Sequence, residues 1–359
     1  MLSVSHHQVL LYENVQECEK ILDGLGPCSF FQSKTWLNLL ASYGQEPFLI
    51  TLVNDKKVVV AYYLMYVTKS DYLSDYSRWK LVSFFDKSLI GMHGPVILDQ
   101  GLSVNEVLVN FLDFIEQHAR KYRTIELFSS PVEEDAIQTS KPLSSLFKIE
   151  VNKTWILELS DEDKDGPSKM RRDRRKNVKK SDEFGLTFQL CENLNDVQAY
   201  VDVRNGAQRH NQLNEIPFSH FEKNWELTRD KDVYFIFLAE QNGRCLAGQA
   251  AFLSGEYLYL TGVAVSPESR SQGIPANDFL QFNVIKWAYS RGVKFIDFVG
   301  ANPESKDEKL KRIDDAKSSW GSQIVSYPVI RKMKLNHNKE FLIRILIKLN
   351  EYFYRHTHS

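Results

Sequence analysis

The apolar residues in the first half of the chain follow two spacings in turn. Four segments are short, apolar and rich in β-branched or aromatic residues, as β-strands are. They are Phe48–Val53, Lys57–Val67, Pro95–Leu98 and Thr124–Phe128. Before the last of them, Ser103 and Glu106 form a capping-box pattern, and the apolar residues as far as Ile115 recur at helical spacing. The pattern predicts a hairpin followed by a strand, a helix and a strand.

The second half of the chain repeats this order. Its predicted strands are Val233–Leu238, Arg244–Leu253, Leu258–Val265 and Val293–Phe298. Asn242 and Gly243, between the first two, give the strongest short signal for a tight hairpin turn. A helix is expected from Ala276 to Tyr289, with Gly292 at its end. We therefore expect a mixed α/β fold made of two tandem copies of one domain.

The boundary between the two copies is expected near residue 160. The polar segment Ser160–Gly166 is typical of an exposed linker. This places an N-terminal domain over residues 1–160, a C-terminal domain over residues 161–337 and a tail over residues 338–359. Charged residues of the tail occupy one narrow helical stripe, and apolar residues occupy the rest. The tail therefore predicts an amphipathic helix that docks on its own protein, or else lies at a membrane interface.

Composition excludes several classes of protein. The chain has 359 residues, 43% of them hydrophobic and 25% charged, as in globular proteins with full cores. Its net charge of −1 argues against a generally basic nucleic-acid binder, and DNA is not an expected partner. The four cysteines lack metal-type or disulfide-type spacing, so we expect no metal site. Without a signal-peptide pattern or an apolar run of about 18 residues, we expect a cytoplasmic protein.

Several segments, taken in order, resemble the FemABX family of aminoacyl and acyl transferases, whose tandem domains belong to the GNAT N-acyltransferase group. They are Phe31–Trp36, Thr154–Leu159, Arg171–Lys180, Phe295–Asn302 and Ala316–Gly321. The resemblance implies two GNAT-like domains without a tightly bound cofactor. It also implies transfer of an acyl or aminoacyl group from acyl-CoA or aminoacyl-tRNA. The acceptor would be an amine on a cell-envelope precursor, an amino sugar or a peptide, either a small molecule or lipid-linked.

Asp297 and Lys317 are the candidate catalytic residues. Asp297 lies in an apolar strand, so it is either on an exposed face or buried with a partner. If buried, it is a general base with a raised pKa, or a structural carboxylate that orients the Gly300–Asn302 loop. An ammonium at Lys317 would stabilise an oxyanion or a carrier phosphate. The alternative for Lys317 is a solvated lysine in a helix rich in other lysines.

Three further residues are candidates for binding the acceptor. Arg209 stands ahead of Pro217 and Phe221, where the family has an Arg before a Pro and an aromatic residue. Arg209 would hold a phosphate or the acceptor, or else belong to a polar loop. Asn302 follows the strand of Asp297. Tyr259 faces the cleft or packs in the core, because alternate side chains of a strand share a face.

The turn after Leu258–Val265 is the candidate donor site. A strand that leads into a helix offers unpaired N–H groups and the positive end of the helix dipole to phosphates. This turn is similar to the GNAT pyrophosphate motif at Arg270, Gln272, Gly273 and Ile274. We therefore expect accessible N–H groups at Gln272 and Gly273. Pro275 departs from the motif because it has no N–H, which leaves the identity of the donor open.

Residues Lys169–Lys180 form a dense basic segment in an otherwise balanced chain. Candidate partners are tRNA and an anionic surface, including peripheral contact with the inner face of the membrane. The segment lacks the aromatic residues that stack on single-stranded bases. The plain alternative is a solvated helix balanced by neighbouring acidic residues. Together with Pro275, the segment supports a second function: a non-catalytic tandem GNAT-fold module that binds RNA or an anionic surface.

Overall fold

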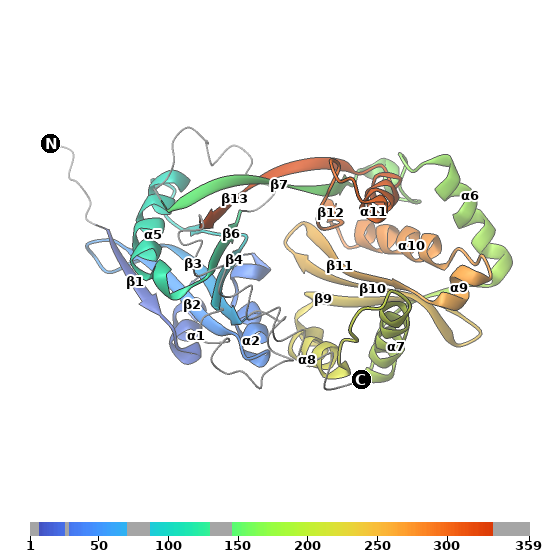
Figure 1. The fold of residues 1–359 in the computed structure, drawn as a ribbon, viewed down its shortest axis with the longest axis horizontal. Coiled ribbons are helices and arrows are strands. Elements are labelled where there is room, and N and C mark those ends of the chain that lie inside the picture. The colour runs from blue at the N-terminus through green and yellow to red at the C-terminus, as the bar shows by residue number, and fades with distance from the viewer. Residues whose placement is uncertain (1–6, 26–28, 70–86, 130–145, 333–359) are drawn as a thin grey trace, which may run out of the picture. The chain divides into compact units, whose positions relative to one another are not determined.

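The computed structural model describes residues 7–25, 29–69, 87–129 and 146–332 (Figure 1). They divide into two compact units. Unit 1 holds the described residues up to Val151 and again from Tyr327, and unit 2 is Asn152–Ser326. The chain thus passes between the units twice, within two long strands, whereas the sequence predicted one boundary near residue 160. The predicted helix of the tail lies outside the described residues.

Unit 1 is built on a mixed sheet with helices on both faces. Its hydrogen-bonded strand order is β1 (Gln8–Tyr12), β2 (Glu46–Val53), β3 (Val59–Lys69), β4 (Lys87–Met92), β6 (Thr124–Phe128) and β13 (Gln323–Lys332), with β5 (Val96–Ile97) on β3. Neighbours are antiparallel except β4 and β6, which are parallel. α5 (Val104–His118) begins with the predicted capping box and buries its apolar face on this sheet. α1 (Val15–Asp23) and α2 (Lys34–Ser42) pack with residues of β2 and β3 in a separate apolar cluster.

Unit 2 has the same plan. Its strand order is β8 (Thr187–Leu190), β9 (Tyr234–Gln241), β10 (Arg244–Ser254), β11 (Tyr257–Val265), β12 (Phe295–Asp297) and β7 (Phe147–Glu158). β11 and β12 are parallel, and α10 (Ala276–Ser290) connects them. The other helices are α6 (Arg172–Ser181), α7 (Leu194–His210), α8 (Phe218–Thr228), α9 (Pro267–Ser271) and α11 (Glu308–Ser318). Asn242 and Gly243 both adopt positive φ in the β9–β10 turn, as predicted.

The repeated pattern predicted from the sequence is therefore present, with one correction. The strand that precedes α5 and runs parallel to β6 is β4, whereas the predicted Pro95–Leu98 segment forms the short β5 on β3. Each unit also takes its last strand from elsewhere in the sequence. β7 follows unit 1 but pairs with β12, and β13 follows unit 2 but pairs with β6. The fold is mixed α/β, as expected.

Short 3₁₀ turns complete the structure. They are Phe30–Gln32, Ala119–Lys121, Asp161–Asp163, Asp182–Phe184 and Arg229–Lys231. The first belongs to the Phe31–Trp36 motif, in which the fully buried Gln32 receives a bond from the Leu64 N–H and donates to the Leu64 and Met92 carbonyls. Ser33 caps α2 by accepting from the N–H of Trp36. In unit 1 this motif holds β3 to the end of β4.

Helices cover both faces of the unit 2 sheet. Figure 1 shows α7 and α8 on one side of β9–β11 and α10 on the other. Leu258 and Ile296 belong to the core that includes α10. Because side chains alternate along a strand, their neighbours Tyr259 and Asp297 face the α7 side. A bulge at Thr261 changes the register of β11, so Gly262 faces α7 as well. Among the described residues, no helix is both long and apolar enough to cross a membrane.

Candidate functional site

The two parallel strands of unit 2 part from each other after three paired residues. β11 pairs with β12 only from Tyr257 to Tyr259, and Tyr259 lies beside Asp297. Beyond that point β11 continues beside β10 alone, while the chain after Asp297 stays on β7 through a bond from the Phe298 N–H to the Trp155 carbonyl of 2.9 Å. Val263, on the part of β11 that β12 leaves free, is 53% exposed. The divergence opens an edge of β11 next to Asp297.

Asp297 is a buried carboxylate with one oxygen engaged. It is 4% exposed, and its Oδ1 accepts from Thr154 Oγ1 at 2.5 Å and from the Val299 N–H at 2.7 Å. Thr154 Oγ1 in turn accepts from the Gly300 N–H at 3.0 Å. Oδ2 makes no hydrogen bond to any described residue. Burial raises the pKa of Asp297, against the lowering effect of these bonds and of Lys317. A carboxyl with a raised pKa and an unused oxygen can accept a proton from a substrate.

The Lys317 side chain bonds to the turn that follows Asp297. Its Nζ donates to the carbonyls of Val299 at 2.7 Å and Gly300 at 2.6 Å. Val299 has a φ of 54°, which is strained for a β-branched residue. Burial lowers the pKa of Lys317, while the charges of Asp314 and Asp297 raise it. Lys317 is therefore no solvated lysine. Two of its three donors hold a strained turn, and one remains for a ligand.

Asn302 is placed by its backbone. Asp314, 7% exposed, accepts from the Asn302 N–H at 2.8 Å and from Trp155 Nε1 at 3.0 Å. Asp314 and Lys317 are three residues apart on α11 and therefore share one face of that helix. α11 thus anchors both ends of the segment that follows β12. Asn302 therefore lies on the segment that follows Asp297, and Asn302 is exposed.

Tyr259 joins this cluster through the pairing of β11 with β12. It is 5% exposed, and burial together with the charge of Asp297 raises its pKa. Its ring stacks on Tyr257, with 5.9 Å between the centroids. Tyr259 is therefore a neutral hydroxyl at physiological pH, on the same face of the sheet as Asp297. Asp297, Lys317, Asn302 and Tyr259 therefore gather around the end of β12, and their roles stay predictions.

Arg204 of α7 is a candidate that the sequence did not indicate. Its Nε is buried without a hydrogen-bond partner. Its NH1 donates to Tyr200 Oη at 3.2 Å, and that hydroxyl donates to the Gly262 carbonyl at 2.8 Å. A Cβ at Gly262 would lie 2.4 Å from the guanidinium. Arg204 forms no ion pair with any described residue. A partly buried guanidinium without a counter-charge favours an anionic ligand.

Arg209 does not join the site in this structure. It lies in the last turn of α7, and its guanidinium pairs with Glu215 at 2.9 Å. Both side chains are exposed. The pair closes the polar loop that follows α7, together with Asn205, which bonds both backbone groups of Ile216. This arrangement corresponds to the polar-loop alternative, and binding by Arg209 remains a prediction.

The expectation of accessible N–H groups in the donor loop is wrong. The N–H groups of Gln272, Gly273 and Ile274 donate to the carbonyls of Glu268, Arg270 and Ser269, at 3.0, 3.3 and 2.9 Å respectively. The short helix α9 causes this, because its last turn uses the N–H groups that follow it. Gly273 has a φ of 64°, so the turn itself requires glycine. Arg270 is exposed, with no ion-pair partner among the described residues.

The first turn of α10 also carries its own charged groups. Asp278, 5% exposed, accepts from Arg174 NH1 at 2.5 Å and from Asn177 Nδ2 at 2.6 Å. Arg174 also donates from Nε to Ser319 Oγ at 2.8 Å. These contacts dock α6 on α10. A carboxylate and its guanidinium partner stand where the helix dipole would otherwise favour an added anion. The preceding loop residues Gln272, Gly273 and Ile274 offer no unpaired N–H group to a pyrophosphate.

The basic segment separates into two faces. Arg174, Asn177 and Val178 lie on the face of α6 that packs toward the core of unit 2, and the opposite face is exposed. Arg172, Lys176 and Lys179 lie along that exposed face at helical spacing, and none pairs with a described carboxylate. We call these three residues the basic stripe. It is a local positive surface on a nearly neutral chain.

Comparison with known proteins supports the fold. Residues 168–311 match the family model of an acetyltransferase (GNAT) domain. The chain aligns with FemX at a TM-score of 0.63 and 15% identity, over 89% of this chain and 96% of that one. It also aligns with the C-terminal domain of a protein named as a lysylphosphatidylglycerol synthetase from Agrobacterium fabrum. The TM-score is 0.56 and the identity 12%, over 92% of this chain and 94% of that one. No curated protein sequence matches the chain.

A tandem GNAT protein from the clavulanic acid biosynthesis pathway also aligns, with a TM-score of 0.51 and 9% identity over 92% of this chain and 99% of that one. At these identities the likenesses establish the fold. Residues 168–311 match the GNAT-domain model, and the chain shares the architecture of these structures over most of its length.

Proposed function

We propose that this protein transfers an acyl or aminoacyl group from an activated carrier to the amine of an acceptor that carries an anionic group. GNAT-type acyl transfer is the class of activity that the fold supports. The observation that carries the proposal is the buried Asp297 at the point where β11 and β12 part, beside a strained turn held by Lys317. Such strain is concentrated at functional sites.

The reaction needs one proton acceptor and one donor for developing charge. The acceptor amine attacks the acyl carbonyl, a C–N bond forms, and the bond from the acyl carbon to the carrier oxygen or sulfur breaks. Asp297 Oδ2 takes the amine proton and returns it to the leaving group. The third N–H of Lys317 stabilises the oxyanion of the tetrahedral intermediate. Tyr259 lies beside Asp297 on the same face of the sheet, and its neutral hydroxyl is also near the reacting atoms.

Arg204 supplies the specificity for the acceptor. Gly262 is three residues beyond Tyr259 on β11, which corresponds to roughly 10 Å at the rise of a β-strand. This span suits an acceptor with an amine at Asp297 and a carboxylate or phosphate at Arg204. Cell-envelope precursors, phosphorylated amino sugars and peptides all have this combination. A lipid-linked acceptor would place the protein at the inner face of the membrane.

Aminoacyl-tRNA fits the donor side of this chain better than acyl-CoA. The loop before α10 uses its own N–H groups, and Asp278 occupies the first turn of that helix. This arrangement favours side chains over the loop backbone as the groups that hold donor phosphates. The basic stripe offers three unpaired cations on an exposed face, which suits a polyanionic carrier. FemX shares the fold, and the donor proposed here rests on the loop and the stripe of this chain.

A donor panel tests the proposal. Purified protein is incubated with acetyl-CoA or with tRNA charged with a mixture of amino acids, together with amine acceptors that carry or lack a carboxylate or phosphate. Mass spectrometry then detects the new amide. We expect transfer from charged tRNA to anionic acceptors. Asp297→Asn should abolish most of it, while Arg204→Met should raise the KM for the acceptor. Absence of product with every donor would refute the transferase.

The basic stripe favours one rival function, a module that binds RNA without catalysis. A variant with Gln at Arg172, Lys176 and Lys179 should weaken RNA binding and reduce its salt dependence under either function. The two functions differ in turnover. The rival predicts RNA binding with no amide product and no effect of Asp297→Asn on any measured property except stability.

A further inference from the structure

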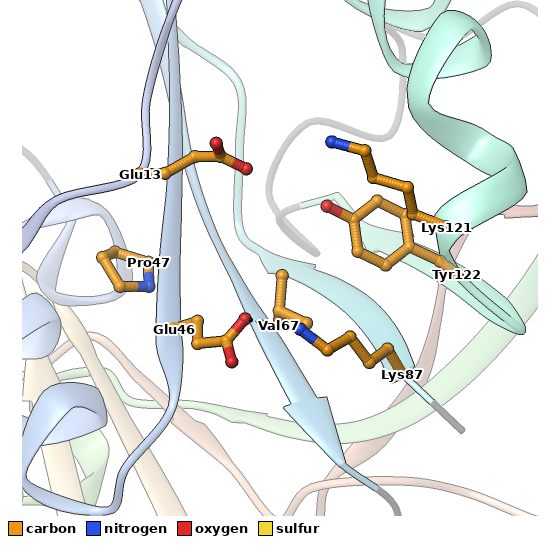
Figure 2. A pocket seen from close by; sticks show the side chains of 7 residues that line it. All are labelled: Glu13, Glu46, Pro47, Val67, Lys87, Lys121 and Tyr122. Carbon is orange, nitrogen blue, oxygen red and sulfur yellow. Dashed lines mark hydrogen bonds and ion pairs between the residues drawn. The ribbon is translucent and has the colours of Figure 1, made fainter. Parts of the chain in front are cut away.

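Unit 1 contains a pocket that the proposed transfer reaction does not use. It has a volume of about 470 Å³. Seven residues line it: Glu13, Glu46, Pro47, Val67, Lys87, Lys121 and Tyr122 (Figure 2). The size lies within the range of small-molecule sites. The mixture of carboxylates, ammonium groups and a phenol on an apolar base is the feature that needs an explanation.

The pocket lies at the edge of the unit 1 sheet where the parallel strands begin. Glu46 and Lys87 are the first residues of β2 and β4, and Tyr122 precedes β6. The candidate site of unit 2 lies at the opposite end of the corresponding strands, after Asp297 at the end of β12. The pocket is therefore not a second copy of that site.

Charges of both signs line the pocket, and the two that lack an ion-pair partner among the described residues lie on opposite sides of it. Figure 2 shows the carboxylates of Glu13 and Glu46 on one side, with the ammonium of Lys121 and the hydroxyl of Tyr122 on the other. Glu46 pairs with Lys87 at 2.9 Å. Neither Glu13 nor Lys121 forms an ion pair with a described residue. One free anion and one free cation thus face a shared space.

Tyr122 is the pocket residue that most strongly indicates a ligand. It is 5% exposed, yet its hydroxyl makes no hydrogen bond to any described residue and points into the space (Figure 2). Burial and the charges of Glu13 and Glu46 raise its pKa to about 12, so the hydroxyl keeps its proton at physiological pH. Its position is fixed, because Lys332 donates to the Tyr122 carbonyl at 2.6 Å and the ring packs edge-on against Phe48. A rigid donor that faces the pocket and bonds no described residue indicates a ligand acceptor group.

From this geometry we propose that the pocket binds a small zwitterion, a short peptide with a free amino group and a free carboxylate. The ligand ammonium lies against Glu13 and Glu46. Its carboxylate accepts from Lys121 and from the Tyr122 hydroxyl. Pro47 and Val67, both buried, form the apolar base under the connecting atoms. Glu13 and Lys121 are exposed residues, so a ligand with only one charge would forgo a charge-assisted contact with one of them.

Calorimetry with three peptides tests the assignment on the full-length protein. Glycylglycine carries both charges, N-acetylglycylglycine lacks the cation and glycylglycinamide lacks the anion. We expect measurable binding of glycylglycine, weakened at least roughly tenfold in each capped peptide by the loss of a charge-assisted contact. Equal binding of all three peptides would overturn the proposal, and so would no binding of glycylglycine at the highest soluble concentration.

Variants at the two unpaired charges sharpen the result. Lys121→Met should weaken glycylglycine binding and abolish the preference over glycylglycinamide, whereas Glu13→Gln should abolish the preference over the acetylated peptide. Lys56→Met and Asp55→Asn, two exposed residues of the β2–β3 turn, are the matched controls. Tyr122→Phe keeps the ring and removes the donor, so it separates hydrogen bonding from folding. Unchanged affinity in Lys121→Met, Glu13→Gln and Tyr122→Phe together would also overturn the proposal. Because the readout is binding, failure of the transfer reaction in unit 2 does not alter it.

Discussion

Replacing Lys317 with methionine removes the group that holds the turn after β12. Methionine fills similar space but cannot donate to the carbonyls of Val299 and Gly300. A hydrogen bond from a charged donor contributes about 1.5–3 kcal/mol to stability. The variant loses two such bonds, but it also no longer has to bury an ammonium, which offsets part of the loss. We expect unfolding to become easier by roughly 3 kcal/mol. For a unit of this size, that lowers the thermal midpoint by roughly 6–12 °C.

The same change should slow transfer. If Lys317 stabilises the oxyanion, Lys317→Met lowers kcat and kcat/KM by similar factors, on the order of 100-fold for one lost electrostatic contact. Steady-state kinetics with varied donor and fixed acceptor gives both constants. Lys309→Met is the matched control, because Lys309 is an exposed lysine of the same helix whose side chain has no ion-pair partner among the described residues.

A second variant separates catalysis from positioning. Val299→Gly removes the penalty of a φ of 54°, so it should stabilise the turn by about 1 kcal/mol. In the double variant with Lys317→Met, a pure positioning role predicts that kcat recovers along with stability. A direct role predicts that stability recovers while kcat stays low. If Lys317→Met alone keeps wild-type kcat and thermal midpoint, the assigned role of Lys317 is refuted.

Four further outcomes follow from the structure. Asp297→Asn should lower transfer but raise the thermal midpoint at neutral pH, because a raised pKa means that ionised Asp297 is unfavourable in the folded state. Melting curves should show this advantage shrinking as the pH falls through the folded pKa, where Asp297 becomes protonated. Gly273→Val should lower the thermal midpoint, since valine is strained at a φ of 64°, and leave donor affinity by calorimetry unchanged. Arg204→Met should raise the KM for anionic acceptors and spare neutral ones, and a uniform loss would contradict that role. Glu126 has the same place beside β4 in unit 1 that Asp297 has beside β11, and Glu126→Gln should leave transfer kinetics unchanged.

Local signals account for the parts of the fold that the sequence predicts well. The capping box at Ser103 and the Asn242-Gly243 turn depend on neighbouring residues alone, and both are present. β4 was missed because Lys87–Met92 is short, contains Ser88 and Gly91, and lacks clear alternation. Its strand conformation depends on pairing with β3 and β6, which are distant in sequence. Such pairing leaves no local pattern.

The candidate site was predictable to a similar extent. Asp297 and Lys317 stand in motifs whose order resembles a known family, and the structure brings them to one turn. The sequence does contain a signal for the bonded N–H groups of the donor loop. Ser266 followed by Pro267 is a typical helix start and predicts α9, whose last turn uses those groups. Arg204 left no such signal. Its contact with Gly262 depends on the bulge in β11, which moves that residue to the α7 face.

The two units place a carboxylate at the same strand position in different surroundings. Ile125 of β6 and Ile296 of β12 take equivalent places beside the preceding parallel strand, so Glu126 corresponds to Asp297. Arg331, on the neighbouring strand β13, lies opposite Glu126 and binds its carboxylate at 2.8 Å. The residue opposite Asp297, on the neighbouring strand β7, is Ile156.

An arginine beside a carboxylate stabilises its ionised form and uses its oxygens. An isoleucine in that place does neither, so Asp297 stays buried with a raised pKa and one unused oxygen. The same strand position therefore holds a paired carboxylate in unit 1, where Arg331 also binds Glu150, and a carboxyl with an unused oxygen in unit 2, as the proposed proton transfer requires. The choice of residue on the neighbouring strand, rather than the carboxylate itself, separates the two roles.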